Sequence, residues 1–209
     1  MNMNRIDGLK IVFVIAENNF HDHEFLIPKK ILENAGAKVY VAGLTNNLSI
    51  GQYGMRVKPE MILSNLSSQN FSAIVLIGGE GSTELWKNRL LHKKLLEFDR
   101  SKKLICAICS AVGILAHANL LVGKKAAAFT SDIEIIQSLG ALITGNNLEI
   151  DGRIITASGP EVSSEFGHAI TAKLSNKKNG PTTNSEKVRR GGLKTVSDTQ
   201  KQKRESHQR

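Results

Sequence analysis

The sequence lacks long apolar runs and contains few cysteines. No uninterrupted apolar stretch approaches the roughly 18 residues that a membrane-spanning helix needs, so we expect no membrane span. The apolar run at 11–16 is too short for the core of a secretory signal peptide, and an asparagine-rich stretch follows it. Two cysteines cannot build a disulfide scaffold. Without a secretory signal they are expected to be reduced thiols in a cytoplasmic protein.

Acidic residues are scarce at the C-terminal end. The 209 residues include 28 Lys and Arg and 19 Asp and Glu, a formal net charge of +9. Segment 176–209 alone carries 10 basic and 3 acidic residues, a net of +7, which leaves a net of only +2 for residues 1–175. The segment also has too few apolar side chains to offset a backbone entropy of about 1–2 kcal/mol per ordered residue. We therefore predict one folded domain over 1–175 and a basic, disordered tail over 176–209.

Two interpretations of the tail remain open. It could be an arm that makes weak, salt-dependent contacts with nucleic acid or with a membrane surface. The alternative, which we favour, is a solvated extension with no specific partner. Because the excess charge lies outside the predicted domain, the net charge by itself does not indicate a nucleic-acid-binding protein.

Short apolar runs alternate with helical patterns along residues 9–174, which predicts an α/β fold. Such an alternation is typical of a mostly parallel sheet with helices on both faces, in which ligands bind at the carboxyl ends of the strands. The expected strands are 9–16, 38–42, 72–77, 104–108 and 125–129, with hairpins at 50–57 and 148–157. The expected helices are 23–34, 85–98, 111–121, 133–139 and 160–174.

Cys109 is the first candidate catalytic residue. It follows the apolar run 104–108 directly and precedes a predicted helix, so it would lie at a tight strand-to-helix turn. The N-terminus of a helix favours a thiolate there. The alternative is that Cys109 is one more small buried side chain. Cys106 completes a C-x-x-C pattern, but it lies within the apolar run and no second cysteine pair could complete a zinc site, so we expect it in the core.

Glu24 and His21 are candidates from the loop after the first strand. A carboxyl group beside a thiol can take or share its proton, as a general acid or base. The alternative for Glu24 is a solvated carboxylate stabilised by the helix dipole. His21 and His23 form an H-x-H pattern that could bind a metal or supply a base, but without a clear third ligand we expect no metal. We also expect no cofactor.

Gly78 and Gly79 end the third predicted strand. Glycines there let backbone amides approach a ligand oxygen and form half of an oxyanion hole, although a plain turn is the alternative. Their spacing does not match a dinucleotide-binding fingerprint. His117 and His168 fall on predicted helices, and we expect both to be packed rather than catalytic.

Four segments in order resemble the superfamily of the PfpI proteases and the Parkinson disease protein deglycase, a class I glutamine amidotransferase-like group. They begin at IVFVIAENNFHDHEFLIP, SAIVLIGGEGS, KLICAICSAVG and IITASGPEVSS, and with their spacers they cover about residues 9–174. The resemblance implies a flavodoxin-like sandwich and a homodimer. It also implies that Cys109 is the nucleophile, that Glu24 is its partner, and that the backbone amides of Gly79 and Ser110 form the oxyanion hole.

The sequence departs from this family at several positions. Ser110 follows the nucleophile where the protease-like branch has histidine, and Phe129 stands where the deglycase branch has histidine. Ile77 replaces the usual proline before the glycine pair, and Ala111-Val112 replaces the usual Gly-Pro or Ala-Pro. Because a peptide leaving group needs an acid, these departures weaken a proteolytic interpretation most, and His21 is left as a possible auxiliary base.

Three functions follow from these patterns. The first is a cysteine-dependent enzyme that acts on a small reactive aldehyde or on a glycated protein, as a glutathione-independent glyoxalase or a protein deglycase. The second is a non-enzymatic sensor of oxidative stress, or a chaperone, in which Cys109 is oxidised to a sulfinate beside Glu24. The third is a cysteine peptidase or amidohydrolase, which needs a histidine within reach of Cys109.

Overall fold

A seven-stranded sheet forms the centre of the protein, whose computed structural model describes residues 4–178. The strands follow the order β11-β12-β8-β7-β1-β3-β6, and all neighbours are parallel except β11 and β12. These strands are β1 (Lys10–Val14), β3 (Lys38–Gly43), β6 (Met61–Ile62), β7 (Ala73–Leu76), β8 (Leu104–Ile108), β11 (Leu148–Asp151) and β12 (Ile154–Ala157). The predicted mostly parallel sheet is confirmed.

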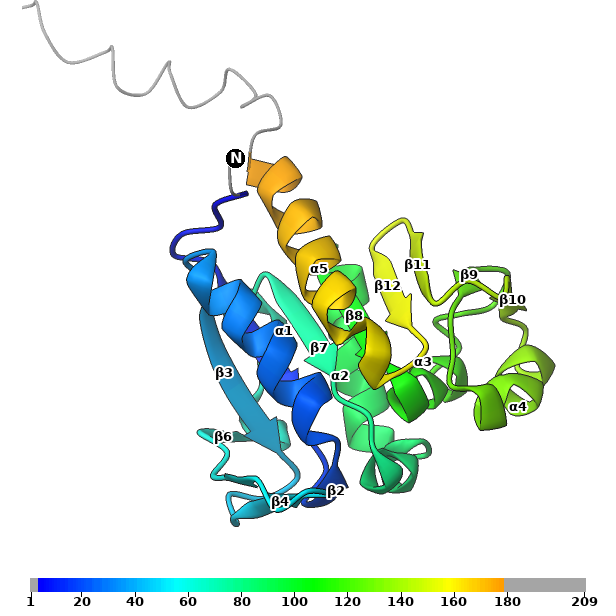
Figure 1. The fold of residues 1–209 in the computed structure, drawn as a ribbon, viewed down its shortest axis with the longest axis horizontal. Helices are drawn as coiled ribbons and strands as arrows, with labels where there is room; N and C mark the ends of the chain where they lie inside the picture. Colours follow the sequence, from blue (N-terminus) through cyan, green and yellow to red (C-terminus); the bar gives the residue numbers. More distant parts are fainter. Residues whose placement is uncertain (1–3, 179–209) are drawn as a thin grey trace, which may run out of the picture. The chain divides into compact units, whose positions relative to one another are not determined.

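Helices cover both faces of this sheet, as predicted (Figure 1). One face packs against α1 (Asp22–Asn34) and α5 (Ser163–Lys178), and the other against α2 (Arg89–Arg100), α3 (Val112–His117) and α4 (Ile133–Ser138). Successive side chains of a strand point to opposite faces, so β1 sends Phe13 to the first layer and Val12 and Val14 to the second. This is why the buried strands read as continuous apolar runs.

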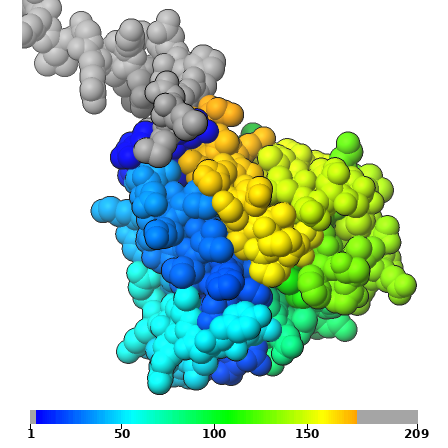
Figure 2. Space-filling model, in the orientation of Figure 1, coloured from blue at the N-terminus to red at the C-terminus, as the bar shows by residue number. Residues whose placement is uncertain are grey.

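Two small sheets flank the central one. One pairs β9 (Lys125–Ala126) with β10 (Leu142–Ile143). The other joins β2 (Asn18–Phe20), β4 (Ser49–Gly51) and β5 (Arg56–Val57), and its antiparallel β4–β5 pair confirms the hairpin predicted at 50–57. The antiparallel pairing of β11 with β12 around Asp151-Gly152 confirms the second hairpin. In Figure 2 the β4–β5 hairpin, in cyan, lies beside α1, in blue.

Several predicted helices begin or end at other residues. Residues Glu80–Leu85 form a 3₁₀ segment, so the helix expected from 85 starts at Arg89, where the Asn88 side chain accepts a hydrogen bond of 2.9 Å from the Leu91 amide. The helix expected over 111–121 extends only over α3 and follows a 3₁₀ turn at Cys109–Ala111. The strand expected at 125–129 is limited to β9. A 3₁₀ turn at Pro160–Val162 likewise precedes α5.

The described residues belong to one compact unit that ends at Lys178. None of the helices within residues 4–178 has the length and apolar character that spanning a membrane requires. The domain boundary proposed between 175 and 176 stays a prediction. Helix α5 itself continues through Lys178, and the rest of the predicted tail lies outside the described residues, together with the disorder and the contacts expected of it.

Candidate active site

Cys109 lies immediately after the central strand β8, in a left-handed backbone conformation. Its φ is +58°, a region in which residues other than glycine are strained by roughly 1–2 kcal/mol. The side chain is 5 % exposed, and α3 begins three residues later. The turn therefore directs the thiol away from the strand, at the carboxyl end of the sheet, as the sequence predicts for a nucleophile.

Glu24 lies in the first turn of α1 and is completely buried. Its Oε2 atom accepts a hydrogen bond of 3.0 Å from the Gly78 amide. A Cβ atom placed on Gly78 would lie 2.6 Å from that oxygen and 2.7 Å from the Cβ of Cys109. Glu24 and Cys109 thus meet across Gly78, where only a residue without a side chain fits. The alternative of a solvated Glu24 carboxylate is wrong.

The protonation of Glu24 and Cys109 is coupled. Burial raises the pKa of Glu24 to about 7, although the Cys109 thiol and the Gly78 amide act in the opposite direction. Burial and the neighbouring Glu24 charge raise the pKa of Cys109 to about 12. Both shifts oppose a state in which thiolate and carboxylate are charged together. A protonated Glu24 removes the repulsion on the thiolate, so the pair is suited to exchange one proton.

Backbone amides surround the sulfur of Cys109. Hydrogen bonds from the backbone of Ser110 and of Gly79 act against the rise of the thiol pKa, because they favour the thiolate. Gly79 has a φ of +96°, and a Cβ atom there would collide with the backbone of Asn19, Phe20 and His21. These are the two amides that the family resemblance assigns to an oxyanion hole, and they lie where negative charge on sulfur, or on an oxygen bound to it, would develop.

A cavity of about 470 Å³ opens above Cys109. Its lining includes Cys109, Ser110 and Gly79 from the site, and it also contains residues that the sequence did not single out for this purpose: Gln52, Tyr53, Glu80, Thr83, Ser131, Asp132 and Pro160. Phe129 also lines it, so an aromatic ring occupies the cavity wall to which the family resemblance assigns a histidine. Asp132 follows the expected strand 125–129, so the rule that ligands bind at strand ends could have identified it.

The histidines differ in their environment. His21 lines the cavity and is 9 % exposed, and burial lowers the pKa of its imidazole. His117 packs against Trp86, with 5.4 Å between ring centroids, as expected. His168 is exposed on α5, so the expectation that it is packed is wrong. Within residues 4–178, no three His, Cys, Asp or Glu side chains are arranged so that they could hold a metal ion.

Asp22 attaches the β4–β5 hairpin to α1. Its carboxylate accepts hydrogen bonds from the amides of Tyr53, at 3.1 Å, and Met55, at 2.8 Å. Tyr53 lies against the rings of His21 and His23, with centroids 5.3 and 5.9 Å away. The hairpin turn therefore forms a wall of the cavity that is held in place by the same helix that carries Glu24.

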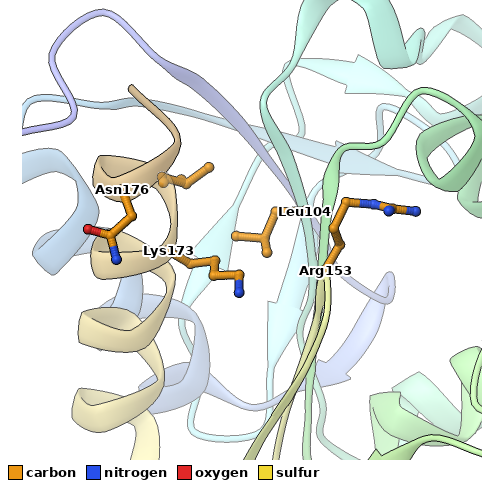
Figure 3. Close-up of a pocket in the computed structure, with 5 residues that line it drawn as sticks. Leu104, Arg153, Lys173 and Asn176 are labelled. Carbon is orange, nitrogen blue, oxygen red and sulfur yellow. The ribbon is translucent and has the colours of Figure 1, made fainter. Parts of the chain in front are cut away.

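A second cavity, of about 290 Å³, lies at the opposite end of β8 (Figure 3). It is lined by Leu104, Arg153, Lys173, Leu174 and Asn176. The Arg153 side chain points away from α5 and its guanidinium pairs with Asp99, 2.7 Å from Nη2 to Oδ1. The described residues that line this cavity include no thiol or carboxylate, so the chemistry predicted from the sequence belongs to the first one.

Comparison with known proteins gives a consistent result. The profile of the DJ-1/PfpI family matches residues 9–173. An uncharacterised protein of Methanocaldococcus jannaschii is 34% identical over 161 residues, which cover 76% of this chain and 78% of the relative. The deglycase PfpI of Pyrococcus furiosus is 26% identical over 156 residues, 73% of this chain and 91% of the relative. A ThiJ/PfpI domain protein of Brachyspira murdochii has a similar structure, with a TM-score of 0.78, 29% identity, and coverage of 80% of this chain and 96% of that one. The fold is the α/β flavodoxin-like fold of these proteins.

Proposed function

Because the chain belongs to the DJ-1/PfpI family, we propose that it is a cysteine-dependent enzyme that acts on reactive carbonyl compounds, as a glutathione-independent glyoxalase or a protein deglycase. The observation that carries this proposal is the contact of Cys109, held at a φ of +58°, with the buried Glu24 across Gly78. A thiol paired with a carboxyl group whose pKa lies near neutrality can add to an aldehyde and return a proton to it. The family relationship with a protein named a deglycase supports the same chemistry.

The reaction on methylglyoxal would begin when the Glu24 carboxylate takes the proton of the Cys109 thiol and the sulfur adds to the aldehyde carbon. The aldehyde oxygen takes up a proton from Glu24, which gives a hemithioacetal, and the amides of Gly79 and Ser110 stabilise the oxygen while it is charged. The Glu24 carboxylate then removes the proton from that carbon and delivers it to the neighbouring carbonyl carbon, while the hydroxyl proton of the hemithioacetal moves to the neighbouring oxygen. The product is the thioester of lactate on Cys109. One water molecule hydrolyses the thioester, releases lactate and restores the thiol.

This function predicts that the purified protein forms lactate from methylglyoxal without glutathione. Cys109→Ala should abolish the activity, and Glu24→Gln should reduce it at least about 100-fold, the usual size of a general acid–base contribution. Cys106→Ala is the matched control, because Cys106 lies in β8, three residues before Cys109, but is completely buried, and it should keep the activity. Lactate formation no greater than in Cys109→Ala would contradict the proposal.

Oxidation sensing is a second candidate, favoured by the two backbone amides that face the Cys109 sulfur. Their N–H groups can donate hydrogen bonds to the oxygens of a sulfinate, which carries negative charge. Mild hydrogen peroxide should then add two oxygen atoms to Cys109 in preference to Cys106, as read by peptide mass spectrometry. A Cys109 that stays unoxidised while the half-buried Met55 and Met61 react would exclude this role.

A peptidase or amidohydrolase has less support. It needs an acid to protonate the leaving amine, and His21 is the histidine that lines the cavity within the described residues. Burial lowers the pKa of that imidazole, so it is mainly neutral at pH 7 and suits a base better than an acid.

The assembly and location expected from the sequence belong to the same proposal. The protein would act in the cytoplasm as a homodimer, in agreement with its family and with its two free cysteines. Sedimentation of the full chain at micromolar concentration tests the dimer, and a monomer under these conditions would contradict it.

A further inference from the structure

The cavity above Cys109 has an acidic wall. Asp132 and Glu80 line it, and Glu161 is close enough for its charge to raise the pKa of His21 and of Glu24. No lysine or arginine occurs among the described residues that line the cavity. The low-dielectric walls of a cleft strengthen the electric field of lining charges that all have the same sign. A bound group therefore meets negative charge from several directions.

Two polar atoms in this lining are buried without a hydrogen-bond partner among the described residues. One is Oδ2 of Asp132, a residue that is 8 % exposed and whose Oδ1 accepts a hydrogen bond of 2.9 Å from the Ser131 hydroxyl. The other is Nδ1 of His21, which is 9 % exposed. An unsatisfied buried polar group costs about 1–3 kcal/mol, so a ligand that donates a hydrogen bond to Asp132 recovers part of that cost.

His21 does not neutralise this wall. Burial, followed by the nearby His23, lowers the pKa of its imidazole, although the charges of Asp22 and Glu161 act in the opposite direction. At neutral pH it is therefore mainly an uncharged ring beside the carboxylates. The cavity keeps its negative charge where a substituent of a carbonyl compound bound to Cys109 would extend.

We propose that this cavity selects carbonyl compounds that carry a cationic group, an ammonium or guanidinium, and rejects those that carry a carboxylate or phosphate. Asp132 is the specificity-determining residue, because its unpartnered oxygen is both charged and able to accept a hydrogen bond from such a group. The reaction on these compounds rests on the proposed carbonyl function, whereas the charge preference of the cavity does not.

The charge preference can be measured without any turnover. Two methanethiosulfonates of similar size, one with a trimethylammonium group and one with a sulfonate group, each form a mixed disulfide with a thiolate and release methanesulfinate. Their rates on Cys109 of the full chain are followed by peptide mass spectrometry, and the cation-to-anion ratio is compared with that of 2-mercaptoethanol. We expect the ratio for Cys109 to be at least about 10-fold higher, the lower end of the range for a cleft of one charge sign.

Asp132→Asn should lower this ratio about threefold or more, because it removes the charge and keeps the shape. Glu134→Gln is the matched control, since Glu134 is an exposed carboxylate two residues away that does not line the cavity, and it should leave the ratio unchanged. Unchanged unfolding midpoints establish that both variants are folded.

Three results would overturn the proposal. The first is a cation-to-anion ratio at Cys109 equal to that of 2-mercaptoethanol. The second is a ratio that falls by the same factor in Asp132→Asn and in Glu134→Gln. The third is a Cys109 that reacts with iodoacetamide but with neither charged reagent, since the cavity would then not admit a charged substituent. If the cation-to-anion ratio is raised as expected but no lactate forms, the carbonyl function is contradicted and the charge preference stands.

Discussion

At the scale of single residues, the left-handed conformation of Cys109 has a measurable cost. Cys109→Gly should be more stable than Cys109→Ala by about 1 kcal/mol, because glycine adopts a positive φ without strain whereas alanine keeps the strain. Chemical denaturation of the two variants measures the difference. Ala111→Gly is the control two residues away, where φ is −67°, and there glycine should lower the stability. An alanine variant of Cys109 that is the more stable of the pair would contradict the expectation.

Glu24 links stability to pH. Its pKa is about 7 in the folded protein, raised from an ordinary value of 4.5 by burial, so between these values the folded state binds more protons than the unfolded one. The free energy of unfolding should therefore fall as the pH rises from below 4.5 to above 7, by a total on the order of 3 kcal/mol from this group. Glu24→Gln should remove that part of the slope. If urea denaturation gives the same pH dependence of stability for the wild type and for Glu24→Gln, the raised pKa of Glu24 is excluded.

At the scale of structural elements, the Asp22 carboxylate determines how the β4–β5 hairpin meets α1. Asp22→Ala leaves the amides of Tyr53 and Met55 without their acceptor, at a cost of about 1–3 kcal/mol, and Asp22→Asn should cost less because it keeps one acceptor oxygen. Hydrogen exchange of these two amides should accelerate in the order wild type, Asn, Ala. Asp99→Ala removes an exposed ion pair elsewhere and should leave that exchange unchanged.

The sequence predicted the elements that consist of buried apolar runs better than the polar segments between them. The runs that contain β1, β7 and β8 are continuous because both of their faces are covered, and they indicated the strand ends at which Cys109 and Gly79 lie. The 3₁₀ segment at Glu80–Leu85 and the strand β2 were missed. Both depend on contacts between loops, which no local periodicity reports.

The same limit applies to the site. Cys109 and Glu24 were recognised because each follows a buried strand, and their contact across Gly78 could be anticipated from the family resemblance. The position of Tyr53 in the cavity could not, because it comes from a segment 56 residues before Cys109. Asp132, 23 residues after Cys109, was indicated only by its place after the expected strand 125–129. Their arrangement is a property of the tertiary fold.

At the scale of the whole molecule, the basic charge and the chemistry belong to different segments. Truncation after Lys178 should leave the unfolding midpoint and the rate of Cys109 alkylation unchanged, because the compact unit ends at that residue. It should also abolish any retention on heparin or RNA, whose strength in the full chain should fall with rising salt. Thermal denaturation, alkylation kinetics and a salt gradient measure these outcomes. Loss of stability on truncation would show that the segment is part of the folded domain.

Cys106 is completely buried in β8, between β7 and β12, so its reactivity measures how often the whole domain unfolds. Burial also raises the pKa of this thiol, so a thiol reagent can modify the native protein at Cys109 but reaches Cys106 only when the sheet separates. A brief pulse of reagent therefore yields singly labelled molecules from the native population and doubly labelled ones from the opened population. The ratio of the two masses counts rare unfolded molecules in a mixture, without a dye, a tag or a substitution.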